Sequence, residues 1–169
     1  MRSIKERNYT VFFTLCQPQT STFVIFFHIL CFMKDFSLVK SLFKDCLKPE
    51  DRYQKIIAMG KKLPPIAEKH RISENIIPGC QSIVYLHTEL REGKLFFTAA
   101  SDALISSGLA ALLILAYDGT SPEVVLKQEP SFLEELQITT SLTPGRSNGL
   151  ASMYLRMQQD ALKFLLPLK

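Results

Sequence analysis

The chain of 169 residues is long enough for one domain, and its apolar fraction of 47% can fill a hydrophobic core. Charged residues at 21% argue against global disorder, and the net charge of +4 comes without the clustered basic stripe typical of nucleic-acid-binding proteins. The four cysteines occur singly, at positions 16, 31, 46 and 80, so no C-x-x-C pair predicts a zinc or redox site.

The first 33 residues differ in composition from the rest of the chain. Their longest apolar run, Phe23 to Met33, spans 11 residues and follows the polar stretch Gln17 to Thr22. Crossing a bilayer takes about 20 apolar residues, so we expect no stable membrane insertion. A basic beginning precedes the apolar residues as in a signal peptide, but no alanine occurs before Ala58 to form a typical cleavage site.

We therefore expect residues 1–33 to form an apolar N-terminal extension and residues 34–169 to form the functional domain. The extension is interpreted as a misassigned start, with Met33 as the alternative first residue, or as a disordered or membrane-associated tail. From Lys34 onward the composition is ordinary for a cytosolic domain, so a cytoplasmic location is expected.

Two helices are predicted at the start of the domain. Apolar residues at helical spacing from Phe36 to Cys46 indicate a short amphipathic helix, with Cys46 on its apolar stripe as a small core residue. Pro49 suits the first turn of a second helix, which ends at Gly60. The predicted buried face of this second helix consists of Tyr53, Ile56, Ile57 and Met59.

A β-hairpin is predicted in the middle of the domain. Alternating side chains indicate one strand from Gln81 to Leu90 and another from Lys94 to Ala100, joined by a short turn that contains glycine. His87 lies on the more polar face of the first strand. Because we identify no second histidine or carboxylate at ligand spacing, we expect no metal site here.

Helices are predicted to complete the domain. Ser101 can cap a helix whose body, Ala103 to Ala116, is apolar on nearly every side and therefore buried. Gly108 within it indicates close packing against the sheet. A capping-box pattern opens a short helix over Ser131 to Leu136, and the last helix starts near Ser147. The element order predicts an α+β fold in which helices cover a small antiparallel sheet.

Cys80 is the residue to which the sequence assigns chemistry. It follows Pro78 and Gly79, a turn-forming pair, at the start of the predicted strand, so we expect it to be presented on a loop. No acid–base partner occurs in the neighbouring sequence, which argues against a protease-like nucleophile. A thiol that exchanges sulfur requires only a thiolate fraction, an approach path and a partner sulfur with a leaving group.

Four ordered blocks of sequence resemble motifs of the SufE family of sulfur-acceptor proteins. Residues 56–64 resemble its I-I-x-x-G-x-x-L-P entry, and residues 75–84 its N-x-(I/V)-x-G-C-Q-S-x-V core. Residues 101–111 resemble S-D-A…G-L-x-A, and residues 142–153 resemble L-T-P-x-R-x-x-G-L-x-x-M. Tyr85 departs from the tryptophan that is frequent in the family. The resemblance implies a SufE/IscU-like α+β fold.

The resemblance also implies a function. Cys80 would accept persulfide sulfur from a PLP-dependent cysteine desulfurase of SufS or CsdA type, stimulate that enzyme, and relay sulfur to a SufBCD-type scaffold for iron–sulfur cluster assembly. The protein would then be a sulfur carrier rather than a free-standing enzyme, without a cofactor, since PLP belongs to the desulfurase. Family positions that shape the cysteine loop or face the partner correspond to Gly79, Gln81, Ser82, Asp102 and Arg146. In the family the cysteine rests partly shielded, with Ile77, Ile83 and the buried helix as the expected shields here.

Two other hypotheses stay open. A non-catalytic adaptor or iron–sulfur scaffold could share the fold, although a scaffold needs about three cysteines or equivalent ligands converging on the metal. Cys80 lies in the matching loop, whereas Cys46 is interpreted as core. An exported, lipoprotein-like thiol protein would depend wholly on the first 33 residues.

Overall fold

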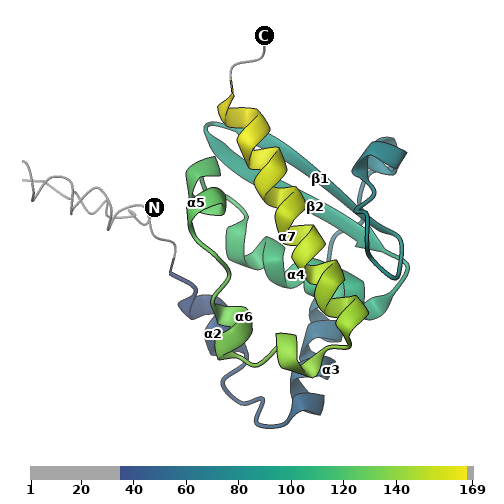
Figure 1. Cartoon of the computed structure of the whole chain (residues 1–169), viewed down its shortest axis with the longest axis vertical. Helices are drawn as coiled ribbons and strands as arrows, with labels where there is room; N and C mark the ends of the chain where they lie inside the picture. Colours follow the sequence, from purple (N-terminus) through teal and green to yellow (C-terminus); the bar gives the residue numbers. More distant parts are fainter. Residues whose placement is uncertain (1–34, 167–169) are drawn as a thin grey trace, which may run out of the picture. The chain divides into compact units, whose positions relative to one another are not determined.

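The computed structural model describes residues 35–166, and Figure 1 shows the arrangement of their helices and of one two-stranded antiparallel sheet. The α+β class expected from the sequence is confirmed. The expected N-terminal extension, residues 1–33, lies outside the described residues, so the domain boundary stays a prediction. Within residues 35–166, no helix combines the length and the apolar character needed to cross a bilayer.

The hairpin consists of β1 (Val84–Arg91) and β2 (Lys94–Ser101), paired along their whole length. Glu92 and Gly93 connect them with φ angles of 50° and 74°, the left-handed conformations of a tight hairpin turn. The predicted first strand began earlier, at Gln81, but residues 81–83 belong to the loop before β1. Pairing therefore begins only where Val84 turns its side chain into the core.

The long apolar helix α4 (Leu104–Tyr117) forms the centre of the core, as its composition predicts. It packs on β2, on α3 (Pro49–Gly60) and on the C-terminal helix α7 (Pro144–Leu165). Ser101 is the last residue of β2, so it does not occupy the N-cap position of α4 that the sequence predicted for it. Its hydroxyl nevertheless accepts a hydrogen bond from the backbone N–H of Ala103 at 3.2 Å, which satisfies one donor at the start of α4.

The close packing predicted from Gly108 is real, but its partner is α3 and not the sheet. A Cβ built on Gly108 would overlap the backbone of Ile56, and one built on Gly60 would lie 2.5 Å from the Gly108 nitrogen. The two glycines therefore let the backbones of α3 and α4 touch. On α3, Ile56 is buried, while the other three residues of the predicted buried face are partly buried against the core.

The remaining helices are short, apart from α7. The first predicted helix is confirmed as α2 (Ser37–Leu42), which ends before Cys46, and Cys46 packs partly buried against the core. The sequence did not locate α5 (Pro122–Lys127). The predicted short helix corresponds to α6 (Phe132–Glu135), without the predicted capping box. The helix α7 begins at Pro144 rather than near Ser147, because proline suits the first position of a helix.

Candidate functional site

Cys80 lies in a loop whose two ends are tied together. The N–H of Ile77 donates to the carbonyl oxygen of Val84 at 2.9 Å, and Ile76 forms an antiparallel bridge with Tyr85. Between these anchors Gly79 adopts a φ of 80°, in the left-handed region that glycine enters without strain. The turn chemistry expected from Pro78 and Gly79 thus places Cys80 near the tip of a loop closed at its base.

The thiol of Cys80 faces the N-terminal turns of α7. Its Sγ lies 3.7 Å from the carbonyl oxygen of Gly149, to which the S–H donates a weak hydrogen bond. Cys80 is partly buried, and this burial raises the pKa of its thiol because a charged thiolate is poorly solvated there. The described conformation therefore holds Cys80 as a shielded, protonated thiol at neutral pH.

The shielding comes only in part from the residues expected to provide it. Ile77 is buried, with 2% of its surface exposed, and belongs to the core beneath the loop. Ile83 is 51% exposed, so its side chain faces solvent and does not cover the thiol. The close contact with Gly149 comes from α7, which the sequence did not indicate as a shield.

A cavity of about 170 Å³ opens beside Cys80, between its loop, the start of α4 and the start of α7. Its apolar wall includes Ile105, Leu109 and Met153. Its polar wall includes Gln81, Ser82, Ser106 and Arg146. The structure therefore gathers Cys80 and three of the residues singled out from the sequence around one small space.

Ser82 connects the cysteine loop to α4. Its hydroxyl lies 2.7 Å from that of Ser106, a residue with 9% of its surface exposed, and the two hydroxyls share a hydrogen bond. The Ser101 hydroxyl adds a hydrogen bond to the carbonyl oxygen of Ile83 at 2.7 Å. These contacts hold the segment between Cys80 and β1 against the start of α4.

Arg146 joins α7 to α3 at the rim of the cavity. Its Nη1 donates to the Tyr53 hydroxyl at 2.6 Å, and its guanidinium carbon lies 5.6 Å from the centre of the Tyr53 ring. Gln81 is exposed on the neighbouring loop and lies against Gly145. Asp102 is exposed after β2, within 3.4 Å of the Ser101 hydroxyl, and does not line the cavity.

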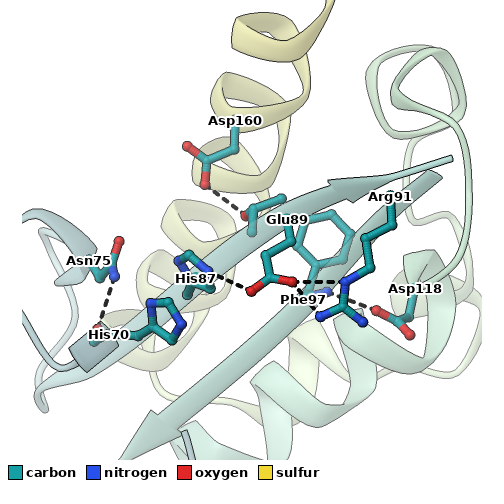
Figure 2. Close-up of polar contacts among 9 residues, drawn as sticks. His70, Asn75, His87, Glu89, Arg91, Phe97, Asp118 and Asp160 are labelled. Carbon is teal, nitrogen blue, oxygen red and sulfur yellow. Dashed lines mark hydrogen bonds and ion pairs between the residues drawn. The ribbon is translucent and has the colours of Figure 1, made fainter. Parts of the chain in front are cut away.

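A second polar cluster lies on β1 and is shown in Figure 2. His70, at the end of the short 3-10 helix η1 (Glu68–His70), stacks on His87 with ring centroids 3.6 Å apart and 17° between the ring planes. His87 Nε2 lies 3.3 Å from Glu89 Oε1, and Arg91 pairs with the other oxygen of Glu89. The structure thus supplies the neighbours that the sequence analysis did not identify for His87.

The two neighbours of His87, Glu89 and His70, differ in how clearly the sequence indicates them. Glu89 lies two positions after His87, and the strand alternation already places both side chains on the same face. His70 lies in a different element before the cysteine loop, and no local pattern connects it to β1. Glu89 could have been found from the sequence, whereas His70 required the fold.

Comparison with known proteins gives consistent matches. Residues 38–161 match the family model described as "SufE: Fe-S metabolism associated domain". An uncharacterized SufE-like protein of Synechocystis sp. is 38% identical over 118 residues, which cover 70% of this chain and 74% of that protein. The chain is also similar to SufE-like protein 1, chloroplastic/mitochondrial, of Arabidopsis thaliana, with 33% identity over 125 residues. That match covers 73% of this chain but 34% of the plant protein, so the chain spans about a third of the plant relative's length.

A solved structure supports the same fold. The solution structure of a hypothetical protein from Thermus thermophilus superposes with a TM-score of 0.62 at 28% sequence identity. The superposition covers 77% of this chain and 92% of the Thermus chain. The helices and the hairpin described above thus form an arrangement that occurs in another protein.

Proposed function

Because the chain belongs to the SufE family, whose domain is associated with Fe–S metabolism, we propose that it is a sulfur acceptor that receives persulfide sulfur on Cys80 from a cysteine desulfurase. The observation that supports this most is the placement of Cys80. The residue lies on a loop anchored at both ends, with its thiol half-buried beside a cavity. Such a loop can move its tip while the sheet and core stay in place.

The proposed transfer is a thiol–disulfide type exchange in which atoms and electrons balance. The Cys80 thiolate attacks the terminal sulfur of the desulfurase persulfide, forming a new S–S bond on Cys80. The S–S bond of the desulfurase persulfide breaks, and the desulfurase cysteine leaves as a thiolate. The product is a Cys80 persulfide, with no net oxidation or reduction. A general base on this chain is not required if docking exposes the thiol to a partner that accepts its proton.

The shielded position of Cys80 suits this role because it keeps the thiol unreactive until a partner docks. Burial raises the pKa of the thiol, so little thiolate is present before a partner docks. A protonated, half-covered thiol is also less readily oxidised to sulfenic acid. The cavity of about 170 Å³ exceeds the roughly 10–15 Å³ that a single water-sized sphere needs, so it can accommodate an added sulfur atom after transfer.

The same proposal assigns partners and roles around the thiol. The donor is a desulfurase of SufS or CsdA type, which brings its own PLP, and the acceptor is a SufBCD-type scaffold. Gln81, exposed beside Cys80, and Arg146 at the cavity rim face the docking partner, while Ser82 holds the loop to α4. A cytoplasmic location stays a prediction, and the plant relative carries the description chloroplastic/mitochondrial.

The decisive experiment is sulfur loading by a purified SufS-type desulfurase with PLP and cysteine. We expect the mass of one sulfur atom to appear on Cys80 under non-reducing conditions, together with faster desulfurase turnover. Cys80→Ser should abolish both effects, and Cys46→Ser, which alters a cysteine packed against the core, should retain them. Full stimulation by Cys80→Ser would overturn the carrier mechanism. A cluster chromophore in anaerobically purified protein would favour the scaffold hypothesis instead.

A further inference from the structure

The histidine–glutamate cluster on β1 has the donor set of a metal site. His70, His87 and Glu89 each present one ligating atom, two imidazole nitrogens and one carboxylate oxygen, all within 4.8 Å of one another. Two histidines with one carboxylate are ligands that Zn²⁺ and related divalent transition metals accept in proteins. The cluster contains no residue that lines the Cys80 cavity, so it is separate from the proposed sulfur-transfer site.

The backbone that carries these ligands is held firmly on both sides. Asn75, with 8% of its surface exposed, donates through Nδ2 to the carbonyl oxygen of His70 at 2.9 Å. On β1, Thr88 lies between the two other ligands and donates to the buried carboxylate of Asp160 on α7 at 2.8 Å. Figure 2 shows Asn75 beside His70, with the hydrogen bond between them as a dashed line. Side chains on a rigid frame form more precise metal sites than side chains on free loops.

The side chains can converge on one ion only if one imidazole ring leaves the stack, because each nitrogen lone pair lies in its ring plane and the two planes are nearly parallel. Zn²⁺ bonds of about 2.0–2.1 Å in a tetrahedron set ligand atoms about 3.3 Å apart. His87 Nε2 and Glu89 Oε1 already lie 3.3 Å apart, although the described hydrogen bond between them must give way to the metal. His70 stacks on His87 and has to turn its ring so that a nitrogen points at the same centre. The side chains of His87 and Glu89 are 22% and 37% exposed, which leaves a fourth position open to water.

Arg91 competes with a metal ion for the carboxylate of Glu89. Its guanidinium pairs with Glu89 Oε2, and its side chain is 63% exposed at the end of the hairpin. A cation bound to Glu89 would repel the guanidinium of Arg91, whose central carbon also lies 5.3 Å from the centre of the Phe96 ring. Arg91 should therefore weaken metal binding without preventing it.

We infer that His70, His87 and Glu89 bind a divalent transition-metal ion of the Zn²⁺ class, with water as the fourth ligand. The inference does not depend on sulfur transfer. In the chain, His70 lies before the Cys80 loop and His87 after it, so a bound ion would join the two flanks of that loop. Metal binding should then slow the opening of the segment between the two histidines.

The test uses the full chain under reducing conditions, titrated with Zn²⁺ by calorimetry and with Co²⁺ by absorption spectroscopy. We expect one ion per chain and, for Co²⁺, the weak visible bands of nitrogen and oxygen ligation. His87→Asn and the isosteric Glu89→Gln should each lower the affinity at least tenfold. Arg91→Gln should raise it severalfold because it frees the carboxylate, an effect that a purely structural role of the cluster does not predict. Circular dichroism checks that each variant is folded.

Matched controls separate this site from other ligands in the chain. His28→Asn alters the one histidine of the sequence that lies outside the cluster, and Cys80→Ser removes the proposed reactive thiol; both should leave the affinity unchanged. Hydrogen exchange of residues 71–79 should slow when Zn²⁺ is added to the wild type but not to His87→Asn. An intense thiolate-to-Co²⁺ charge-transfer band that disappears in Cys80→Ser would overturn the inference. So would an affinity that His87→Asn and Glu89→Gln leave unchanged.

Discussion

Gly149 lies directly against the sulfur of Cys80, because a Cβ built on Gly149 would be 3.3 Å from Sγ. This distance is too short for comfortable van der Waals contact, so a side chain at position 149 would press on the thiol. The buried surface of α7 therefore helps determine how deeply Cys80 rests.

Gly149→Ala should make Cys80 more reactive. The added methyl group pushes a thiol on a loop away from a helix that cannot easily move, while the helix itself gains about 1 kcal/mol from alanine's higher propensity. We expect a severalfold faster alkylation of Cys80 by iodoacetamide at neutral pH, measured by mass spectrometry. Gly93→Asn in the hairpin turn is the control, because nothing lies within 4 Å of a Cβ at that position and the contacts of Cys80 stay unchanged. Equal alkylation rates in Gly149→Ala and wild type would contradict a shielding role of this contact.

The raised pKa of Cys80 predicts how stability changes with pH. Its folded-state pKa lies above the unfolded value of about 8.5, so burial favours the neutral thiol in the native protein. The resulting stabilisation is complete below the unfolded pKa and is lost as pH rises through the folded pKa. The unfolding free energy of wild type relative to Cys80→Ser should therefore fall as pH increases above the unfolded pKa.

Urea denaturation of both proteins across this pH range measures the difference. Tyr117 is a second group whose pKa is raised by burial, but it is present in both proteins and cancels from the comparison. A pH-independent difference between wild type and Cys80→Ser would show that the thiol titrates as an exposed cysteine.

Gly108→Ala should be strongly destabilising. Its Cβ would overlap the backbone of Ile56 in α3, and a backbone cannot rotate away as a side chain can. Overpacking of this kind costs typically about 1–3 kcal/mol, and we expect the upper end, read as a lower urea midpoint. Gly93→Asn is the control, since nothing lies within 4 Å of its Cβ position and asparagine tolerates the left-handed φ of 74°. A loss for Gly108→Ala no greater than for Gly93→Asn would mean that α3 and α4 are not in close contact.

Asp160→Ala should destabilise the protein and loosen the approach to the cysteine loop. Asp160 is 5% exposed and accepts hydrogen bonds from Arg156, Lys163 and Thr88. Removing one partner of a buried pair leaves the other charge uncompensated, at a cost of about 3 kcal/mol. Arg156 also donates to the carbonyl oxygen of Glu74 at 2.9 Å, so its release should free that segment.

Chemical denaturation and hydrogen exchange test the two effects of Asp160→Ala separately. We expect faster exchange of residues 73–77 under conditions in which the protein remains folded. Glu68→Gln, which removes the exposed ion pair with Arg71, should change neither measurement. Unaltered exchange of residues 73–77 in Asp160→Ala would show that Arg156 does not hold them.

The sequence was informative where a pattern is local. The alternation around Val84 and Leu86 predicted β1, and the nearly continuous apolar run after Ala103 predicted the buried helix α4. Both patterns reflect burial on one face or on all faces, which propensity and periodicity express directly. Two predicted element boundaries differ from the structure. The strand starts later than predicted because turn geometry competes with the strand pattern at Gln81. The last helix starts earlier than predicted because Pro144 begins it before its apolar face begins.

Contacts between segments that are distant in the sequence could not be predicted from such local patterns. Gly108 indicated that something packs closely, but a glycine does not specify its partner, which is Ile56 on α3. The turn before Cys80 predicted presentation on a loop, yet the contact with Gly149 joins positions 69 residues apart. The stacking of His70 on His87 likewise arises only when the chain brings η1 beside β1.

The backbone hydrogen bond between Ile77 and Val84 limits how far Cys80 can move from the domain. With the base of the loop closed, Cys80 is separated from its nearest anchor by the short stretch Pro78–Gly79. A fully extended chain spans at most about 3.6 Å per residue, so the Cys80 backbone can travel only about 10 Å from Ile77 while this hydrogen bond persists. For the proposed sulfur transfer, a partner would therefore have to bring its own sulfur into contact with the protein surface. The loop acts as a short tether and not as a long swinging arm.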